Sequence, residues 1–133
     1  MTKTIAQKVL FKNTTPQVLY SLYMDAKKHS LVTGAKAVIS EKEGSKFTIY
    51  DGYSGGKTLQ VVKNKLIIQS WRASDWSKTD VDSTVVFLFE QKGKDTVVHF
   101  TQVNLPANQA NDLKKGWVDF YWKPWKQFLA KRA

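Results

Sequence analysis

Two histidines are the main candidates for chemistry, because the chain contains no cysteine that could bind a metal or act as a nucleophile. His29 and His99 do not form a pair at the spacing of metal ligands, so we expect no metal site. His99 lies on a predicted strand, and Glu90 lies on the predicted strand before it, so this carboxylate could partner the imidazole across the strands in acid/base work. A lone histidine on a strand is more commonly a surface residue or a satisfied core residue.

A catalytic constellation is not visible elsewhere in the chain. No serine, histidine and aspartate fall in a known nucleophile motif. We therefore expect a binding protein that is not an enzyme and that needs no cofactor.

The aromatic residues offer a different chemistry, because the chain has five tryptophans, five tyrosines and seven phenylalanines. Rings of this size usually fill the core, which is the favoured role for Phe87, Phe89, Phe100, Trp117 and Phe120. When they pack across a bent helix they can also leave a cavity for an apolar ligand. The wall of such a cavity is predicted to contain Tyr50, Trp71, Phe87, Phe100, Trp117, Tyr121 and Trp125.

Two polar or exposed positions extend this hypothesis. Gln102 could give the cavity one polar group, although strand pairing or solvation is the more ordinary role for it. Trp76 lies among polar residues in the stretch 74–80. With Arg72 it is predicted to form a partner contact or the lid of the cavity, because exposed tryptophans tend to anchor interfaces. The alternative is that Trp76 packs back on the sheet.

The net charge of +10 raises the question of nucleic-acid binding. The basic residues occur singly or in pairs such as Lys27-Lys28 and Lys114-Lys115, interleaved with acidic residues, so no basic stripe forms. We therefore expect no nucleic-acid partner, and an acidic protein partner is the better alternative. No apolar run is long enough for a signal peptide or a membrane span, and the lack of cysteine suits the cytoplasm.

The elements that must position these residues begin with a strand over 4–11, where Ile5, Val9 and Phe11 share one face. Thr15 and Pro16 then predict the start of a helix. A second short helix is expected from Asp25, as its cap, through Val32, with Thr33-Gly34 ending it.

The middle of the chain reads as a meander of β runs over 36–40, 46–50, 57–62, 66–73, 84–91 and 96–105. Turn residues separate these runs, including Tyr53–Gly56 between the second and the third. With the strand over 4–11, an antiparallel sheet of about seven strands is predicted.

The last element is a helix from Asn108, as its cap, to about Lys131. At 100° per residue, one broad apolar face collects Leu113, Trp117, Phe120, Tyr121, Pro124, Trp125 and Phe128. Pro124 lacks an amide hydrogen, so a bend is expected near Phe120 that wraps the helix around the sheet. One α+β domain over 1–133 follows, with this helix across the concave face of the sheet.

Particular residues add a family resemblance to this order of elements. They are Gly44-Ser45-Lys46-Phe47 leading to Gly52 and Gly56, Trp71-Arg72 with Trp76, Ser83-Thr84, Thr96 with Gln102 and Leu105-Pro106, and Gly116-Trp117 with Phe120-Tyr121. Over nearly the whole chain the pattern resembles the START-like superfamily, also called SRPBCC or helix-grip. Within it, the pattern is similar to the C-terminal domain of the activators of the heat-shock protein 90 ATPase.

The resemblance implies a helix-grip fold and three alternative functions. The first is non-enzymatic binding of a hydrophobic small molecule or lipid between the sheet and the C-terminal helix. The second is binding to the heat-shock protein 90 chaperone with stimulation of its ATPase. The third is an enzyme of the cyclase or hydrolase kind. The oligomeric state is left open by the sequence.

Overall fold

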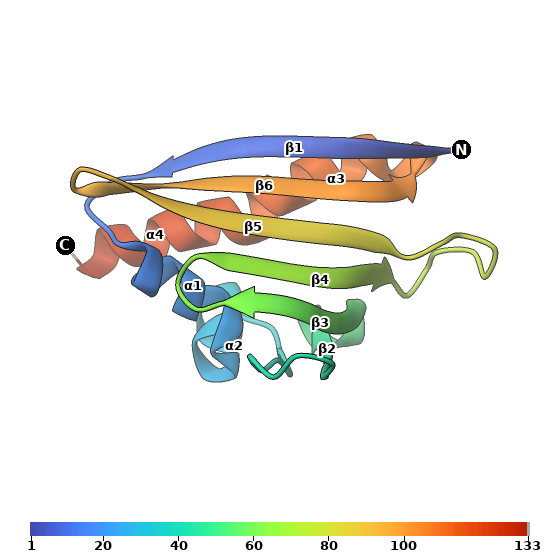
Figure 1. The fold of residues 1–133 in the computed structure, drawn as a ribbon, viewed down its shortest axis with the longest axis horizontal. Helices are drawn as coiled ribbons and strands as arrows, with labels where there is room; N and C mark the ends of the chain where they lie inside the picture. Colours follow the sequence, from blue (N-terminus) through green and yellow to red (C-terminus); the bar gives the residue numbers. More distant parts are fainter. Residues whose placement is uncertain (133) are drawn as a thin grey trace.

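The computed structural model describes residues 1–132 and places a six-stranded antiparallel sheet against helices. The strands lie in the order β1-β6-β5-β4-β3-β2. In Figure 1 the C-terminal helical segment runs along one face of the sheet, and α1 and α2 lie toward its β2–β3 edge. The α+β class and the helix-grip arrangement are thus confirmed.

The N-terminal elements lie close to where the sequence predicted, although β1 begins at Thr2, two residues before the predicted start. β1 (Thr2–Phe11) leads into α1 (Pro16–Met24), whose first turn is capped because Val18 N donates to Thr15 Oγ1 at 3.3 Å. α2 (Ala26–Thr33) is capped by Asp25, which accepts from Lys28 N at 3.0 Å. Gly34 ends α2 with φ 77°, a left-handed conformation that glycine adopts without steric cost.

At the centre of the sheet, large side chains from neighbouring strands lie side by side on the face that is buried in the core. The strands are β2 (Lys46–Ile49), β3 (Ser54–Val62), β4 (Leu66–Ala73), β5 (Ser83–Lys92) and β6 (Asp95–Pro106). Phe87 of β5 pairs with Ile67 and Phe100 on its two neighbours, and all three side chains are buried. The alternation of buried and more exposed residues along β4 and β5 is the pattern of strands with one face in the core.

The predicted strand over 36–40 is wrong, and this explains why the sheet has six strands instead of about seven. Only Val38 pairs with another strand, through an isolated bridge to Thr48. Neighbouring backbone groups bond to side chains instead: Lys36 N donates to Asp51 Oδ1 at 2.9 Å, and Ala37 N donates to Ser30 Oγ at 2.9 Å. These side chains hold the segment away from a regular ladder.

The predicted turn at Tyr53–Gly56 is also wrong, because most of this stretch belongs to β3. Gly55 pairs with Thr48 on one side and Arg72 on the other. A Cβ atom at Gly56 would lie 2.1 Å from the Ser70 carbonyl oxygen. Glycine is required here because neighbouring backbones approach closely, and not because the chain turns.

The C-terminal segment is helical but not one regular helix. After a 3₁₀ turn (Ala107–Gln109), α3 (Ala110–Trp117) begins without a side-chain cap, so the predicted capping by Asn108 is wrong. A π-helical turn (Val118–Trp122) joins α3 to α4 (Lys123–Arg132). Lys123 N bonds to the carbonyl of Val118, five residues earlier. The expected irregularity near Phe120 is therefore present as a widened turn.

The π-helical turn changes which side chains face the sheet. Phe120, predicted for the buried face, is 55% exposed, whereas Trp122 is 2% exposed. Because the π-helical turn joins residues five apart by backbone hydrogen bonds, Trp122 lies on nearly the same side of the helix as Trp117. The centroids of the two rings are 6.0 Å apart. Trp122 Nε1 then donates to Gln7 Oε1 on β1 at 2.8 Å, which ties the helix to the edge strand.

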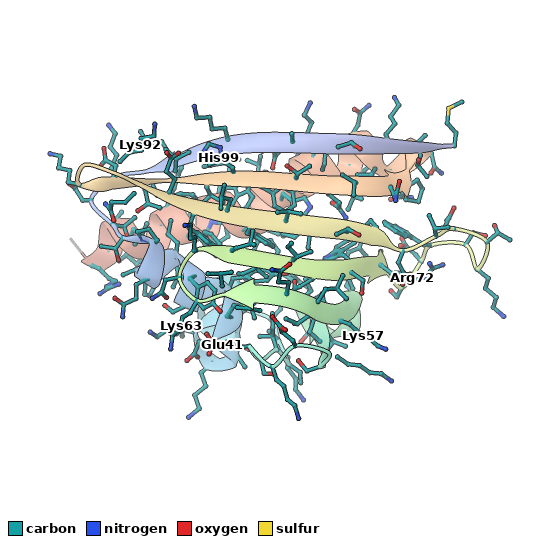
Figure 2. The ribbon with its side chains drawn as sticks, viewed as in Figure 1. Glu41, Lys57, Lys63, Arg72, Lys92 and His99 are labelled. Atoms are coloured by element: carbon teal, nitrogen blue, oxygen red, sulfur yellow. The ribbon has the colours of Figure 1, made fainter. Side chains whose placement is uncertain are left out.

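The surface carries the basic residues in a dispersed pattern. Figure 2 shows that Lys57, Lys63 and Lys92 lie on separate parts of the molecule. This agrees with the expectation that the lysines form no single stripe. Within residues 1–132, no helix is both long enough and apolar enough to cross a membrane.

Candidate functional site

A pocket of about 500 Å³ lies between the C-terminal helical segment and the part of the sheet nearest β2. Small-molecule sites commonly have volumes of about 300–1,000 Å³. Six aromatic side chains line it: Tyr50, Tyr53, Trp71, Trp117, Phe120 and Tyr121. The other lining residues are Ile49, Ser54, Gln109, Asp112, Leu113 and Gly116. We call these twelve residues the aromatic pocket.

Close ring packing fixes the walls of the aromatic pocket. On the helical side, Trp117 and Tyr121 are one turn apart and their ring centroids lie 4.8 Å from each other. Trp71 of β4 lies 6.0 Å from Trp117, and Tyr50 lies 5.6 Å from Tyr121. Such distances are typical of favourable aromatic pairs, so the walls have a defined shape.

Tyr50 is held in place by an unusual backbone and by the helix. It opens a 3₁₀ turn (Tyr50–Gly52) with φ 50°, a left-handed conformation that is rare for a bulky residue. Its hydroxyl donates to the carbonyl oxygen of Phe120. That carbonyl is four residues before Pro124, which has no amide hydrogen to offer it. Tyr50 thus supplies the hydrogen bond that the proline removes, and burial raises the pKa of Tyr50 to about 12.

Tyr121 is positioned by a buried histidine of α2. The Nδ1 atom of His29 lies 2.7 Å from the carbonyl oxygen of Tyr23, which can only accept, so Nδ1 carries the proton. Nε2 of His29 is therefore the acceptor for the Tyr121 hydroxyl, at 2.9 Å. His29 is 1% exposed, and its burial lowers its pKa from 6.5 to about 4. The imidazole is neutral at pH 7 and acts as a structural acceptor.

Four of the predicted cavity residues do not line the aromatic pocket. Phe87, Phe100 and Trp125 form the packed core beneath it and are at most 1% exposed. Gln102 is also fully buried, where Trp117 Nε1 donates to its Oε1 at 2.9 Å and its Nε2 donates to Ser83 Oγ at 2.9 Å. Tyr50, Trp71, Trp117 and Tyr121 are the predicted residues that the structure brings together.

Several lining residues that the prediction missed lie on the C-terminal helical segment. Leu113 and Phe120 were on the predicted helical face, and Gly116 lies one turn after Asp112 on the same side. Helical spacing could have added all of them. Tyr53 could not have been found in this way, because its position depends on the left-handed turn that starts at Tyr50.

Arg72 and Trp76 organise the loop between β4 and β5, next to which Figure 2 places Arg72. Trp76 is 7% exposed and its ring lies 5.6 Å from Trp71, so it packs back on the sheet. Arg72 Nη1 donates to the Asp80 carbonyl at 2.7 Å and to Asp82 Oδ1 at 3.1 Å, and Nη2 donates to the Ser77 carbonyl. Both side chains thus serve the loop itself, and their contact with a partner remains a prediction.

His99 and Glu90 do meet across neighbouring strands, as the sequence indicated. His99 Nε2 lies 2.9 Å from Glu90 Oε1, and both side chains are at the surface. Hydrogen bonding from His99 is the main reason why the pKa of Glu90 is lowered. Neither residue lines the aromatic pocket.

Two other hollows are larger than the aromatic pocket but have charged rims. One, of about 640 Å³, is lined in part by Lys12, Lys126 and Arg132. The other, of about 670 Å³, includes Lys27 and Glu41. Their mixed polar walls suit water better than a small apolar molecule, so the aromatic pocket is the stronger candidate site.

Comparison with known proteins places this geometry in a family. The family described as "Activator of Hsp90 ATPase homolog 1-like protein" matches residues 13–130. The "Activator of 90 kDa heat shock protein ATPase homolog" of Dictyostelium discoideum is 30% identical over 117 residues, which are 87% of this chain and 30% of that protein. The human "Activator of 90 kDa heat shock protein ATPase homolog 1" is 26% identical over 114 residues, covering 86% of this chain and 33% of that protein. The chain therefore spans about a third of the length of these relatives.

Solved structures show the same fold. An HSP90 activator from Plasmodium falciparum superposes with a TM-score of 0.88 at 24% identity and covers 96% of both chains. A protein from Mesorhizobium loti superposes with a TM-score of 0.82 at 18% identity, over 98% of this chain and 99% of that chain. The resemblance to the START-like superfamily is confirmed, and the match over residues 13–130 shows that the chain belongs to the Activator of Hsp90 ATPase homolog 1-like protein family.

Proposed function

We propose that the chain binds a small hydrophobic molecule or lipid in the aromatic pocket and does not transform it chemically. The observation that carries this proposal is a volume of about 500 Å³ walled by six aromatic side chains. An apolar ligand that leaves water for such a space gains roughly 25 cal/mol per Å² of buried apolar surface.

Two tyrosine hydroxyls in the pocket wall already donate to acceptors of the protein, which supports binding over catalysis. The Tyr50 hydroxyl donates to the Phe120 carbonyl, and the Tyr121 hydroxyl donates to His29. Both donors are thus used to hold the walls together. An enzyme of the cyclase or hydrolase kind needs polar groups that converge on a substrate, so it is the less favoured alternative.

Gly116 offers a direct way to fill the aromatic pocket without disturbing its walls. A Cβ atom at this position would meet only Phe120 Cδ2, at 3.8 Å, which is an ordinary contact. A Gly116→Leu side chain is therefore expected to occupy the pocket and weaken binding of the neutral dye N-phenyl-1-naphthylamine by at least about tenfold. Fluorescence titration measures the change.

The matched control is Gly116→Ala, whose single methyl group leaves most of the volume free. Both variants are expected to raise the free energy of unfolding by about 0.5–1 kcal/mol, because glycine is unfavourable inside a helix. Urea denaturation checks that they fold. Equal dye binding by Gly116→Leu and the wild type would place the ligand elsewhere and refute the proposal.

A second candidate function rests on the names of the relatives, several of which are called activators of the heat-shock protein 90 ATPase. The chain would then bind this chaperone and stimulate its ATPase. The loop that Arg72 holds is the surface suggested by the sequence, because Arg72 bonds to the backbone of Ser77 and Asp80.

The chaperone hypothesis predicts that the chain raises the ATPase rate of the heat-shock protein 90 from the same source. Arg72→Ala should remove most of this stimulation, because the loop loses its internal hydrogen bonds. Lys92→Ala, which changes an exposed basic residue at another part of the surface, is the control and should retain it (Figure 2). An unchanged ATPase rate with excess wild-type chain would exclude this function.

A further inference from the structure

The aromatic pocket differs in charge from the protein that surrounds it. The chain carries a net charge of +10, yet among the described residues that line the pocket the only charged side chain is Asp112. A pocket built for a fatty acid or another anion would be expected to use one of the 21 lysines and arginines. The local charge instead favours a cation.

Asp112 is available to a ligand because its neighbours are otherwise engaged. It lies on the exposed side of α3, and within residues 1–132 it forms no ion pair. Lys115, three residues further along the helix, pairs with Asp119 instead. Tyr53, opposite Asp112 in the pocket, has its pKa raised by burial and then by the charges of Asp75 and Asp112. The charge of Asp112 therefore acts on Tyr53 at this side of the pocket.

The aromatic rings complement a cation as well. The faces of tryptophan and tyrosine rings carry partial negative charge and attract ammonium groups within about 6 Å, most strongly when the groups are weakly hydrated. Tyr50, Tyr53, Trp71, Trp117, Phe120 and Tyr121 supply six rings to the pocket that Asp112 also lines. Such a set resembles the aromatic cages that bind quaternary ammonium groups in general.

From this combination we infer that the natural ligand of the aromatic pocket is an organic cation, with an apolar body and an alkylated ammonium group placed near Asp112. This inference rests on the proposed function, because it specifies the chemistry of the molecule that the pocket takes.

Three probes of similar shape separate charge from apolar burial. They are phenyltrimethylammonium, its neutral carbon isostere tert-butylbenzene, and benzoate. We expect the cation to bind roughly fivefold more tightly than the neutral probe, and benzoate to bind more weakly than both. NMR titration of the tryptophan indole N–H signals reports the site, because Trp71 and Trp117 line the pocket whereas Trp122 and Trp125 do not.

Asp112→Asn tests the role of the carboxylate. It removes the charge with almost no change in shape, and it should abolish most of the preference for the cation while binding of tert-butylbenzene stays the same. Glu90→Gln is the matched control, since it changes the net charge equally but lies outside the pocket. It should keep the wild-type preference.

The outcomes distinguish this inference from the proposed function. Equal affinity for the cation and tert-butylbenzene, or a preference that survives in Asp112→Asn, overturns the cation inference and leaves apolar binding intact. Tighter binding of benzoate overturns it as well. If no probe shifts the Trp71 and Trp117 signals and the neutral dye does not bind either, the proposed function fails and the inference fails with it.

Discussion

Replacement of Trp117 by alanine is expected to lower the free energy of unfolding by about 3–5 kcal/mol. The ring is 3% exposed and packs against Phe100 at 4.4 Å and Phe87 at 5.8 Å, so its removal leaves a cavity between helix and sheet. Its loss also leaves the buried Oε1 of Gln102 without the indole donor. Equilibrium urea denaturation, followed by far-UV circular dichroism, measures the change.

Trp117→Phe separates the two contributions. It keeps an aromatic ring in the core but cannot donate to Gln102, so a smaller loss of roughly 1–3 kcal/mol is expected. A loss below about 1 kcal/mol for Trp117→Ala would mean that the core does not depend on this ring. The helix would then be held to the sheet mainly by Trp122 and Trp125.

Acidification is the second change with a large expected effect, and His29 is its cause. Burial lowers the pKa of His29 in the folded protein from 6.5 to about 4, so the unfolded chain binds the proton more tightly. The contribution of neutral His29 to the free energy of unfolding is therefore fully present above pH 6.5. It falls as the pH drops from 6.5 to about 4, and it is lost below pH 4. At about 1.4 kcal/mol per pKa unit, the total loss is on the order of 3 kcal/mol.

The structural reason is the direction of two hydrogen bonds. Protonated Nε2 would present a hydrogen to the Tyr121 hydroxyl, which now donates to it. Tyr121 would have to turn its hydrogen away among Tyr23 and Tyr50, whose rings lie 5.8 and 5.6 Å from its own. Because Tyr121 lines the aromatic pocket, ligand binding should weaken over the same pH range.

Urea denaturation at a series of pH values from 7 to 5 tests this account, since most carboxylates stay ionised there. His29→Gln removes the titrating group and should flatten the profile between these values. His99→Gln changes the other histidine and leaves His29 in place, so this control should retain the fall in stability between these values. A wild-type stability that is constant from pH 7 to 5 would show that His29 accepts a proton without cost.

Much of the fold could be predicted because local signals and the overall packing agree. Thr15 with Pro16 and Asp25 mark helix starts through specific cap hydrogen bonds, and alternation along 84–91 marks a strand with one buried face. Pro124 likewise identified the irregular part of the C-terminal helix. These features depend on neighbours in sequence, which a single chain reveals directly.

The errors arise where distant groups decide the local structure. Trp122 was absent from the predicted buried face because a regular helix rotates by 100° per residue, whereas the π-helical turn brings residues five apart together. Similarly, backbone amides of residues 36–40 form hydrogen bonds with the side chains of Asp51 and Ser30 instead of with a neighbouring strand. The apolar–polar alternation of residues 36–40 carries no information about Asp51 or Ser30, so these two hydrogen bonds could not be predicted from the pattern.

Half of the predicted cavity residues line the candidate site. Tyr50, Trp71, Trp117 and Tyr121 were identified from their size and from helical spacing. The division between pocket wall and filled core depends on how tightly each ring is packed, which places Phe87 and Trp125 in the core. Asp112 was not identified, because a single carboxylate on an exposed helix face has no distinctive pattern.

Native mass spectrometry of the chain purified from its own cells tests the central claim most directly. The account predicts a second species, heavier than the polypeptide by the mass of one small molecule, in the wild type and in Gly116→Ala but not in Gly116→Leu. A single species at the mass of the polypeptide in all three proteins, together with no binding of the neutral dye, would contradict the claim that the aromatic pocket holds a ligand.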